Sequence, residues 1–138
     1  MIKKIKILNY KISIITLKLF KDKLKQFLKF KRKSYICVSA VHGAVESFYN
    51  NKYKIAHDKA EIAVPDGRPI YWALKLLGNP KVDHLPGYFV TNEICKLANK
   101  KDYKIGVYGS TEDVQRDFIK NIKKKYNNIK FTYLFSPP

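Results

Sequence analysis

The sequence predicts an α/β fold with a Rossmann-like, mostly parallel sheet and helices on both of its faces. Short apolar runs alternate with segments of helical periodicity, which is the pattern of strands joined by crossover helices. The chain has 138 residues and is 46% hydrophobic, which is enough for one core of ordinary size. We therefore expect residues 1–138 to form a single domain.

The first thirty residues predict strands followed by a helix. Ile5 to Ile15 fits one or two short strands with a turn near Asn9, and Thr16 is a candidate N-cap. Such a helix could lie on a membrane surface or pack its apolar stripe on a sheet, and we favour packing because the stripe is narrow and lacks an interfacial tryptophan. The stripe repeats at helical spacing among lysines and consists of Leu17, Phe20, Leu24, Phe27 and Leu28.

Strands and helices alternate through the rest of the chain. Apolar and β-branched runs predict strands at residues 34–39, 61–65, 104–108 and 129–134. Helical spacing and terminal signals predict helices at residues 41–50, 52–59, 69–78, 88–99 and 111–126.

A carboxylate follows the most clearly apolar strand. Pro65 ends the run at residues 62–64, Asp66 comes next, and Gly67 gives the turn its conformational freedom. Pro69 fits the first turn of the following helix. Open α/β sheets bind ligands at the carboxyl ends of their strands, so Asp66 is a candidate catalytic base. The alternative is that Asp66 only caps the helix.

Two further side chains follow the strand at residues 34–39. Ser39 and His42 would lie near another carboxyl end, facing Asp66, and are candidate substrate contacts. Serine, histidine and aspartate together suggest a hydrolase triad, but the chain has no Gly-x-Ser-x-Gly elbow, and Ser39 and His42 share one local segment. His42 alone is more often a capping or hydrogen-bonding residue.

A second strand-to-helix turn could bind phosphate. Backbone N–H groups at Gly109, Ser110 and Thr111 would point toward such a ligand, although Thr111 as a plain N-cap explains the pattern equally well. Arg68, at the start of a helix beside Asp66, could meet a phosphate or carboxylate or stay solvated. The three histidines have no metal-site spacing.

The charge is large and uneven. The net charge is +17, and residues 1–36 hold twelve Lys or Arg against one acid, Asp22. This balance favours an anionic partner such as lipid headgroups, a phosphorylated substrate or nucleic acid, unless lysine is simply the default surface residue of the proteome. No nucleic-acid partner is expected, because the signatures of the common binding modules are absent.

Sequence features favour a cytoplasmic location. No apolar run approaches the length of a membrane span, and no signal peptide is recognisable. Cys37 and Cys95 lack CxxC spacing and are expected to be a reduced pair.

Five segments in order resemble the WecG/TagA/CpsF family of bacterial glycosyltransferases (glycosyltransferase family 26). The resemblance covers nearly the whole chain, and its centre is the Pro-Asp-Gly signature at residues 65–67. The five segments are residues 37–47, 60–72, 76–88, 104–111 and 135–138.

This resemblance implies an inverting transfer of N-acetylmannosamine or a related hexosamine from a UDP-sugar to a polyprenyl-diphosphate-linked acceptor. The reaction would take place at the cytoplasmic face of the membrane and feed teichoic acid, common antigen, capsule or exopolysaccharide. By resemblance, Asp66 would be the base, and no metal or other cofactor is expected. Substrate contacts would come from Ser39, His42, Arg68, Gly109, Ser110 and Thr111.

The chain departs from the family pattern in a few places. His84 stands where many members carry an arginine, and residues 38–40 read Val-Ser-Ala where many carry Thr-x-Asn. Family members usually continue well beyond the segment matched by Pro138. A truncated, inactive sugar-nucleotide-binding remnant, or one subunit of a split enzyme, is therefore the alternative to a complete enzyme. A homo-oligomer or a C-terminal partner subunit is the corresponding expected partner.

Overall fold

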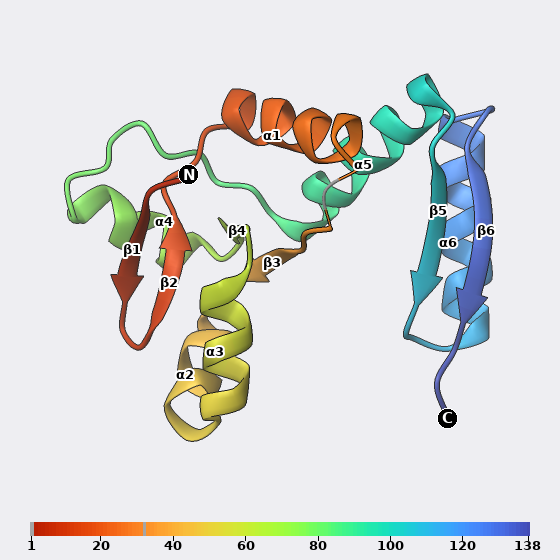
Figure 1. Ribbon diagram of the computed structural model, residues 1–138. Helices are drawn as coiled ribbons and strands as arrows, with labels where there is room; N and C mark the ends of the chain where they lie inside the picture. The colour runs from red at the N-terminus through yellow and green to blue at the C-terminus, as the bar shows by residue number, and fades with distance from the viewer. Residues whose placement is uncertain (1, 32) are drawn as a thin grey trace. The chain divides into compact units, whose positions relative to one another are not determined.

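The computed structural model describes residues 2–31 and 33–138 and confirms the α/β class (Figure 1). The chain forms two compact units, Met1–Phe89 and Val90–Pro138. The described residues contain three two-stranded sheets, of which two are parallel and one is antiparallel. That the two units form a single domain stays a prediction.

The first unit contains four strands and five helical segments, counting the start of α5, within its described part. The β1–β2 pair is antiparallel, and Leu8 adopts a left-handed conformation (φ 54°) beside Asn9 in the turn between them, so the expected turn near Asn9 is confirmed and joins two strands into a hairpin. The elements are β1 (Lys4–Ile7), β2 (Tyr10–Ser13), α1 (Leu17–Lys29), β3 (Ile36–Ser39), α2 (Val41–Tyr49), α3 (Asn51–Lys59), β4 (Ile62–Pro65), α4 (Arg68–Leu76) and the first residues of α5 (Gly87–Lys101).

The parallel pair β3–β4 positions the candidate site. Ser39 lies opposite Pro65 in the register, so both strands end at the same edge of the sheet. Every residue of β4 is buried, as its continuous apolar run predicts. On the other side, the Ala63 N–H donates to Ser13 Oγ (2.9 Å), which links β4 to the β1–β2 hairpin.

Helix α1 packs by part of its apolar stripe. Thr16 caps it, with Oγ1 accepting from the Leu19 N–H at 3.2 Å. Phe20 and Leu24 are buried, whereas Leu28 is exposed. The preferred interpretation of this segment as a helix packed by its stripe agrees with these burials.

Helix α4 buries a narrower face than its composition suggests. Ile70 and Leu74 lie in the core cluster, whereas the apolar side chains Trp72, Leu76 and Leu77 are exposed. The reason is geometric, because residues four apart share one face of a helix and only that face meets the rest of the unit. The remaining buried members of the cluster are Ile7, Tyr10, Ile12, Ala44 and Val82.

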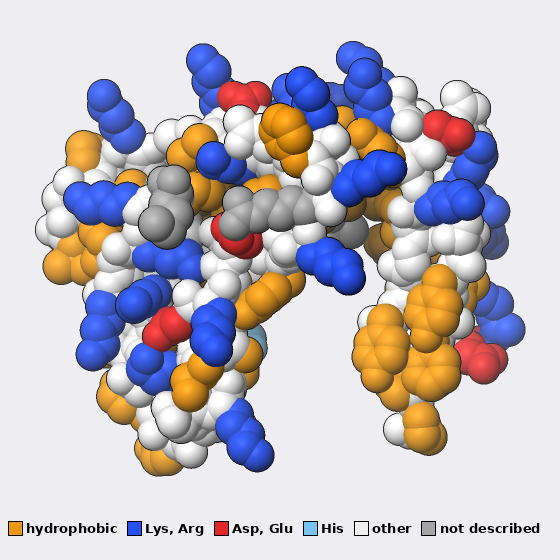
Figure 2. Space-filling model, viewed as in Figure 1, with side chains coloured by type: hydrophobic (Ala, Val, Ile, Leu, Met, Phe, Trp, Pro, Cys, Tyr) orange, Lys and Arg blue, Asp and Glu red, His pale blue; other side chains and the backbone are white. Residues whose placement is uncertain are grey.

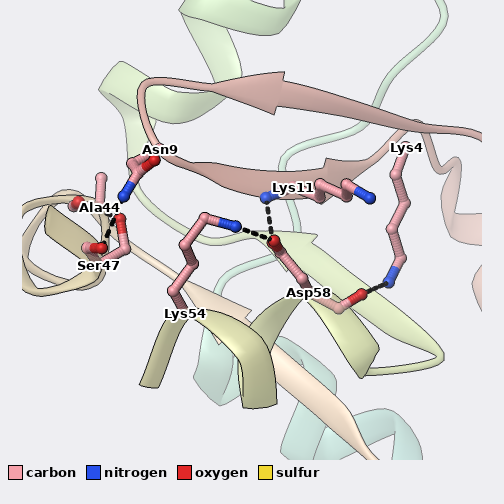
Figure 3. Close-up of polar contacts among 7 residues, drawn as sticks. All are labelled: Lys4, Asn9, Lys11, Ala44, Ser47, Lys54 and Asp58. Atoms are coloured by element: carbon pink, nitrogen blue, oxygen red, sulfur yellow. Dashed lines mark hydrogen bonds and ion pairs between the residues drawn. The ribbon is translucent and has the colours of Figure 1, made fainter. Parts of the chain in front are cut away.

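A carboxylate at the end of α3 ties the hairpin to that helix (Figure 3). Asp58 accepts from the Lys11 backbone N–H (2.8 Å) and from Lys54 Nζ (2.6 Å), and its backbone carbonyl accepts from Lys4 Nζ (3.1 Å). Asn9 reaches α2 in the same way, donating to the Ser47 carbonyl at 2.7 Å. These contacts fix the β1–β2 hairpin against α2 and α3.

The second unit begins with most of α5 and continues as a βαβ arrangement. Strands β5 (Lys104–Tyr108) and β6 (Lys130–Phe135) are parallel, and α6 (Glu112–Lys125) connects them and lies against one face of the pair (Figure 1). Strand β5 matches the predicted bounds, and the other predicted elements agree to within two residues at most ends. The core cluster of this unit consists of Cys95, Tyr126 and Ile129, with Ile105, Phe118, Ile122 and Phe131 packed against it.

Candidate active site

Asp66 is held from three directions at the end of β4. Its backbone N–H donates to the Ser39 carbonyl (3.1 Å), and its carboxylate Oδ1 accepts from the Gly87 N–H (2.9 Å). His84 Nε2 lies within hydrogen-bond distance of the Asp66 carbonyl, and because a carbonyl can only accept, the ring nitrogen must be the donor. The residue is therefore positioned by β3, by the loop that precedes α5 and by the first residue of α5.

That loop follows the end of β4 closely. The Leu85 N–H donates to the Pro65 carbonyl at 3.0 Å. A Cβ placed on Gly87 would lie 3.4 Å from Val38 Cγ1, so this residue packs next to β3. The site is thus built from the ends of two parallel strands, one loop and the first residue of α5, all within the first unit.

Only one of the two carboxylate oxygens of Asp66 makes a hydrogen bond to the described residues. Oδ1 accepts one backbone hydrogen bond, whereas Oδ2 has no hydrogen-bond partner among the described residues. The residue is partly exposed, and Oδ2 is the carboxylate oxygen left to accept a hydrogen bond from a ligand hydroxyl. A carboxylate with one anchored oxygen and one open oxygen suits general base catalysis, which needs an oriented acceptor within hydrogen-bond reach of the proton.

Asp66 does not cap α4. The N-cap is Gly67, no side chain caps the helix, and the Asp66 carboxylate turns to Gly87 instead. Arg68 is the first residue of α4 and is exposed, and Pro69 follows in the first turn as predicted. The guanidinium can therefore reach solvent two residues from the carboxylate.

Ser39 and His42 lie in different surroundings. Ser39 is completely buried, and its Oγ lies 2.8 Å from His57 Nε2. His42 is exposed in the first turn of α2. Ser39 therefore supports Asp66 through its backbone carbonyl, while direct contact of either side chain with substrate stays a prediction.

His57 is buried beneath the site, against aromatic rings. Its ring centroid is 4.4 Å from that of Tyr10, and Nδ1 has no hydrogen-bond partner among the described residues. Burial lowers the pKa of His57 below its ordinary value of 6.5, with Asp58 opposing this shift and Lys4 adding to it. The neutral imidazole is therefore the form that suits the folded chain.

We expect the free energy of unfolding to fall as the pH drops below about 6.5, because the unfolded histidine binds a proton there and the folded one does not. Urea titrations at a series of pH values should give a smaller dependence for His57→Gln, which has no group titrating at this position. Burial would raise the pKa of Asp58, but hydrogen bonds from Lys54 and Lys11 outweigh it and lower this pKa. The stability that these bonds contribute is lost only as the pH falls below about 3.8, outside the range in which His57 titrates. A His57→Gln profile as steep as that of the unaltered chain between pH 5 and 7 would contradict this expectation.

The candidate phosphate turn lies in the second unit and is well ordered by its own contacts. Thr111 caps α6, with Oγ1 accepting from the Val114 N–H at 3.5 Å. Gln115 Nε2 donates to the Gly109 carbonyl at 2.6 Å, and the Gly109 φ of 101° requires glycine. Ser110 is exposed in a left-handed conformation (φ 64°). Phosphate binding by these three residues stays a prediction.

The sequence did not predict the contacts of three side chains that position the candidate sites. His57 and Gln115 are buried polar residues on otherwise amphipathic helices, and their only signal was a polar residue at a core-facing position. His84 had a stronger signal, because it stands where many family members carry an arginine, but its contact with Asp66 appears only in the structure.

No three His, Cys, Asp or Glu side chains come together as a metal site in residues 2–31 and 33–138. Over the same residues, no helix has the length and apolar character needed to cross a bilayer.

The fold and the Asp66 site define an α/β protein with a carboxylate at the carboxyl edge of a parallel strand pair. The model of the protein family described as "Glycosyl transferase WecG/TagA/CpsF family" matches residues 5–138 of this chain. The chain therefore belongs to this glycosyltransferase family.

Two curated relatives carry the same name, N-acetylglucosaminyldiphosphoundecaprenol N-acetyl-beta-D-mannosaminyltransferase. The protein from Bacillus subtilis (strain 168) is 30% identical over 117 residues, which cover 78% of this chain and 45% of the relative. The protein from Bacillus spizizenii (strain ATCC 23059 / NRRL B-14472 / W23) is 25% identical over 84 residues, covering 61% of this chain and 33% of the relative. The chain thus spans less than half the length of either relative.

Proposed function

We propose that this chain takes part in the transfer of N-acetylmannosamine, or a related hexosamine, from a UDP-sugar to a polyprenyl-diphosphate-linked acceptor. Membership of the family and the names of both relatives support the sugar and the acceptor. The observation that carries the proposal is the partly exposed Asp66 carboxylate, anchored by the Gly87 N–H through Oδ1 and with no hydrogen-bond partner for Oδ2 among the described residues.

The proposed step is a single inverting displacement. The acceptor hydroxyl oxygen attacks the anomeric carbon of the donor, and Asp66 Oδ2 takes the hydroxyl proton as the new C–O bond forms. The bond between the anomeric carbon and the UDP oxygen breaks, and UDP leaves with the electron pair. Attack from the face opposite the leaving group inverts the anomeric centre.

Charge on the leaving diphosphate has to be stabilised during this step. Arg68 is proposed for this role because it lies exposed two residues from Asp66. The turn at Gly109, Ser110 and Thr111 is proposed to hold phosphate through its backbone N–H groups. Ser39 and His42 are proposed to contact or shape the substrate, without a metal or other cofactor.

The proposed setting is the cytoplasmic face of the cell membrane, with the protein attached peripherally. A lipid-linked acceptor named for both relatives supports this location. The product would enter synthesis of an envelope polysaccharide such as teichoic acid, capsule or exopolysaccharide.

A second candidate is a subunit, or inactive remnant, that binds the nucleotide sugar without turning it over alone. This candidate is favoured by the 45% and 33% coverage of the relatives. A second copy, or a separate polypeptide corresponding to the remainder of the relatives, would then be the partner.

UDP release separates the two candidates. The purified chain is incubated with UDP-N-acetylmannosamine, with and without a polyprenyl-diphosphate-N-acetylglucosamine analogue. We expect release only when both substrates are present, together with formation of the disaccharide lipid. Release that does not depend on the acceptor would contradict a transferase. Binding of the donor without release, measured by calorimetry, would favour the second candidate.

A further inference from the structure

The side of α1 opposite its buried stripe is strongly basic. Leu17–Lys29 contains five lysines and a single acid, Asp22. Lys18, Lys25 and Lys29 are exposed, and their spacing of seven and four residues places them on one helical face. Figure 2 shows Lys and Arg side chains projecting outward along this helix.

Apolar side chains are exposed at the carboxyl end of the same helix. Phe30, the C-cap residue, is 70% exposed, and Leu28 beside it is 36% exposed. Lys29 Nζ lies 5.5 Å from the centre of the Phe30 ring, and Lys31 and Lys33 are exposed just beyond. An exposed aromatic ring with one ammonium group over it, in a lysine-rich segment, combines the two properties that bind a protein to an anionic bilayer.

The start of α1 is joined to the segment that holds Asp66. The Leu17 N–H donates to Asp83 Oδ2 (2.8 Å), and the Asp83 N–H donates to the Ile15 carbonyl (3.0 Å). The next residue, His84, donates to the Asp66 carbonyl. The orientation of α1 is therefore coupled through two neighbouring residues to the orientation of the candidate base.

We propose that Lys18, Lys25, Lys29, Phe30 and Lys31 form a docking surface for an anionic phospholipid bilayer, here named the α1 basic surface. Its lysines contact the lipid phosphates, and Phe30 enters the boundary between headgroups and acyl chains. The choice of a bilayer as the partner rests on the proposed function, because a lipid-linked acceptor lies in a membrane. Docking of α1 holds the Asp66 segment in a fixed orientation relative to that membrane.

Charge complementarity and the exposed ring favour lipid over other polyanions. Lysine meets phosphate as a point charge and does not require the planar, bidentate geometry for which arginine is selected. Leu28 and Phe30 stay in water beside a solvated phosphate backbone, whereas their transfer out of water at a bilayer surface is favourable.

Vesicle co-sedimentation of the full chain tests the surface without any sugar donor. Vesicles of phosphatidylcholine alone are compared with vesicles that also contain phosphatidylglycerol. We expect binding only to the second kind, weakening as salt is raised. The triple variant Lys18→Gln, Lys25→Gln, Lys29→Gln should bind about 100-fold more weakly, because each lysine near an anionic surface contributes roughly fivefold.

A matched variant removes the same charge elsewhere. Lys120, Lys123 and Lys124 are exposed on α6, and their replacement by glutamine should change binding by only a few fold. Equal loss in both triple variants would show an effect of overall charge and overturn the proposal. Unchanged binding of the α1 triple variant, or equal binding to phosphatidylcholine alone, would also overturn it.

Phe30→Ser separates insertion from charge. Because Phe30 is exposed, this change should leave folding intact by circular dichroism while weakening binding about tenfold. No loss in Phe30→Ser would remove Phe30 from the surface and overturn the proposal as stated. None of these measurements depends on turnover, so a failure of vesicle binding is distinguishable from a failure of the transferase proposal.

Discussion

Replacing Asp66 with asparagine should reduce the rate of sugar transfer by a factor of roughly 10² to 10⁴, the range of a lost general base. The amide cannot accept the proton of the acceptor hydroxyl. Its oxygen can still accept the Gly87 N–H that now bonds to Oδ1, so the loop and the end of β4 should keep their positions. The substitution therefore removes the charge with little change in shape.

The measurement is the initial rate of UDP release at saturating donor and acceptor, beside a thermal unfolding curve. Asp117→Asn is the matched control, because Asp117 is an exposed carboxylate on α6 in the other unit. Asp66→Ala adds the loss of the Gly87 contact and should also shift KM. Equal turnover in Asp66→Asn and the unaltered chain would exclude Asp66 as the base.

Leu74→Ala should cost about 2–5 kcal/mol of the free energy of unfolding of the first unit. Leu74 is fully buried in the cluster with Tyr10 and Val82, so the truncated side chain leaves a cavity and loses its transfer free energy. Native domains are stable by only about 5–15 kcal/mol, so much of the unit's stability is at risk.

Leu76→Ala is the internal control for this prediction. It is the same substitution two residues along the same helix, at a side chain that is 88% exposed, and it should change stability by less than about 0.5 kcal/mol. Urea unfolding followed by circular dichroism compares the two variants. Equal destabilisation would mean that α4 does not bury Leu74 in solution.

Local sequence was sufficient to predict the Asp66 turn. A buried apolar run ended by Pro65, followed by Asp66, Gly67 and a proline at the start of a helix, involves contacts between close neighbours in the chain. Strand and helix identities followed for the same reason, because periodicity of apolar residues reports which face of each element is covered.

The partners of Asp66 could not be obtained in this way. Gly87 and His84 lie about twenty residues further along the chain, and their contact with Asp66 depends on how the loop before α5 crosses the end of β4. Likewise, nothing local distinguishes Leu74 from Leu76 or predicts that His57 turns inward to Ser39. Each depends on which elements pack together.

The sequence by itself determined the α/β class, the order of the elements and the position of a carboxylate after a buried strand. The tertiary structure decided that the carboxylate faces the Gly87 N–H instead of capping α4, and that Phe20 and Leu24 of the α1 stripe are buried while Leu28 is exposed. The physical reason is that backbone propensity and periodicity act over a few residues, whereas hydrogen-bond partners and burial are set by contacts between segments distant in the chain.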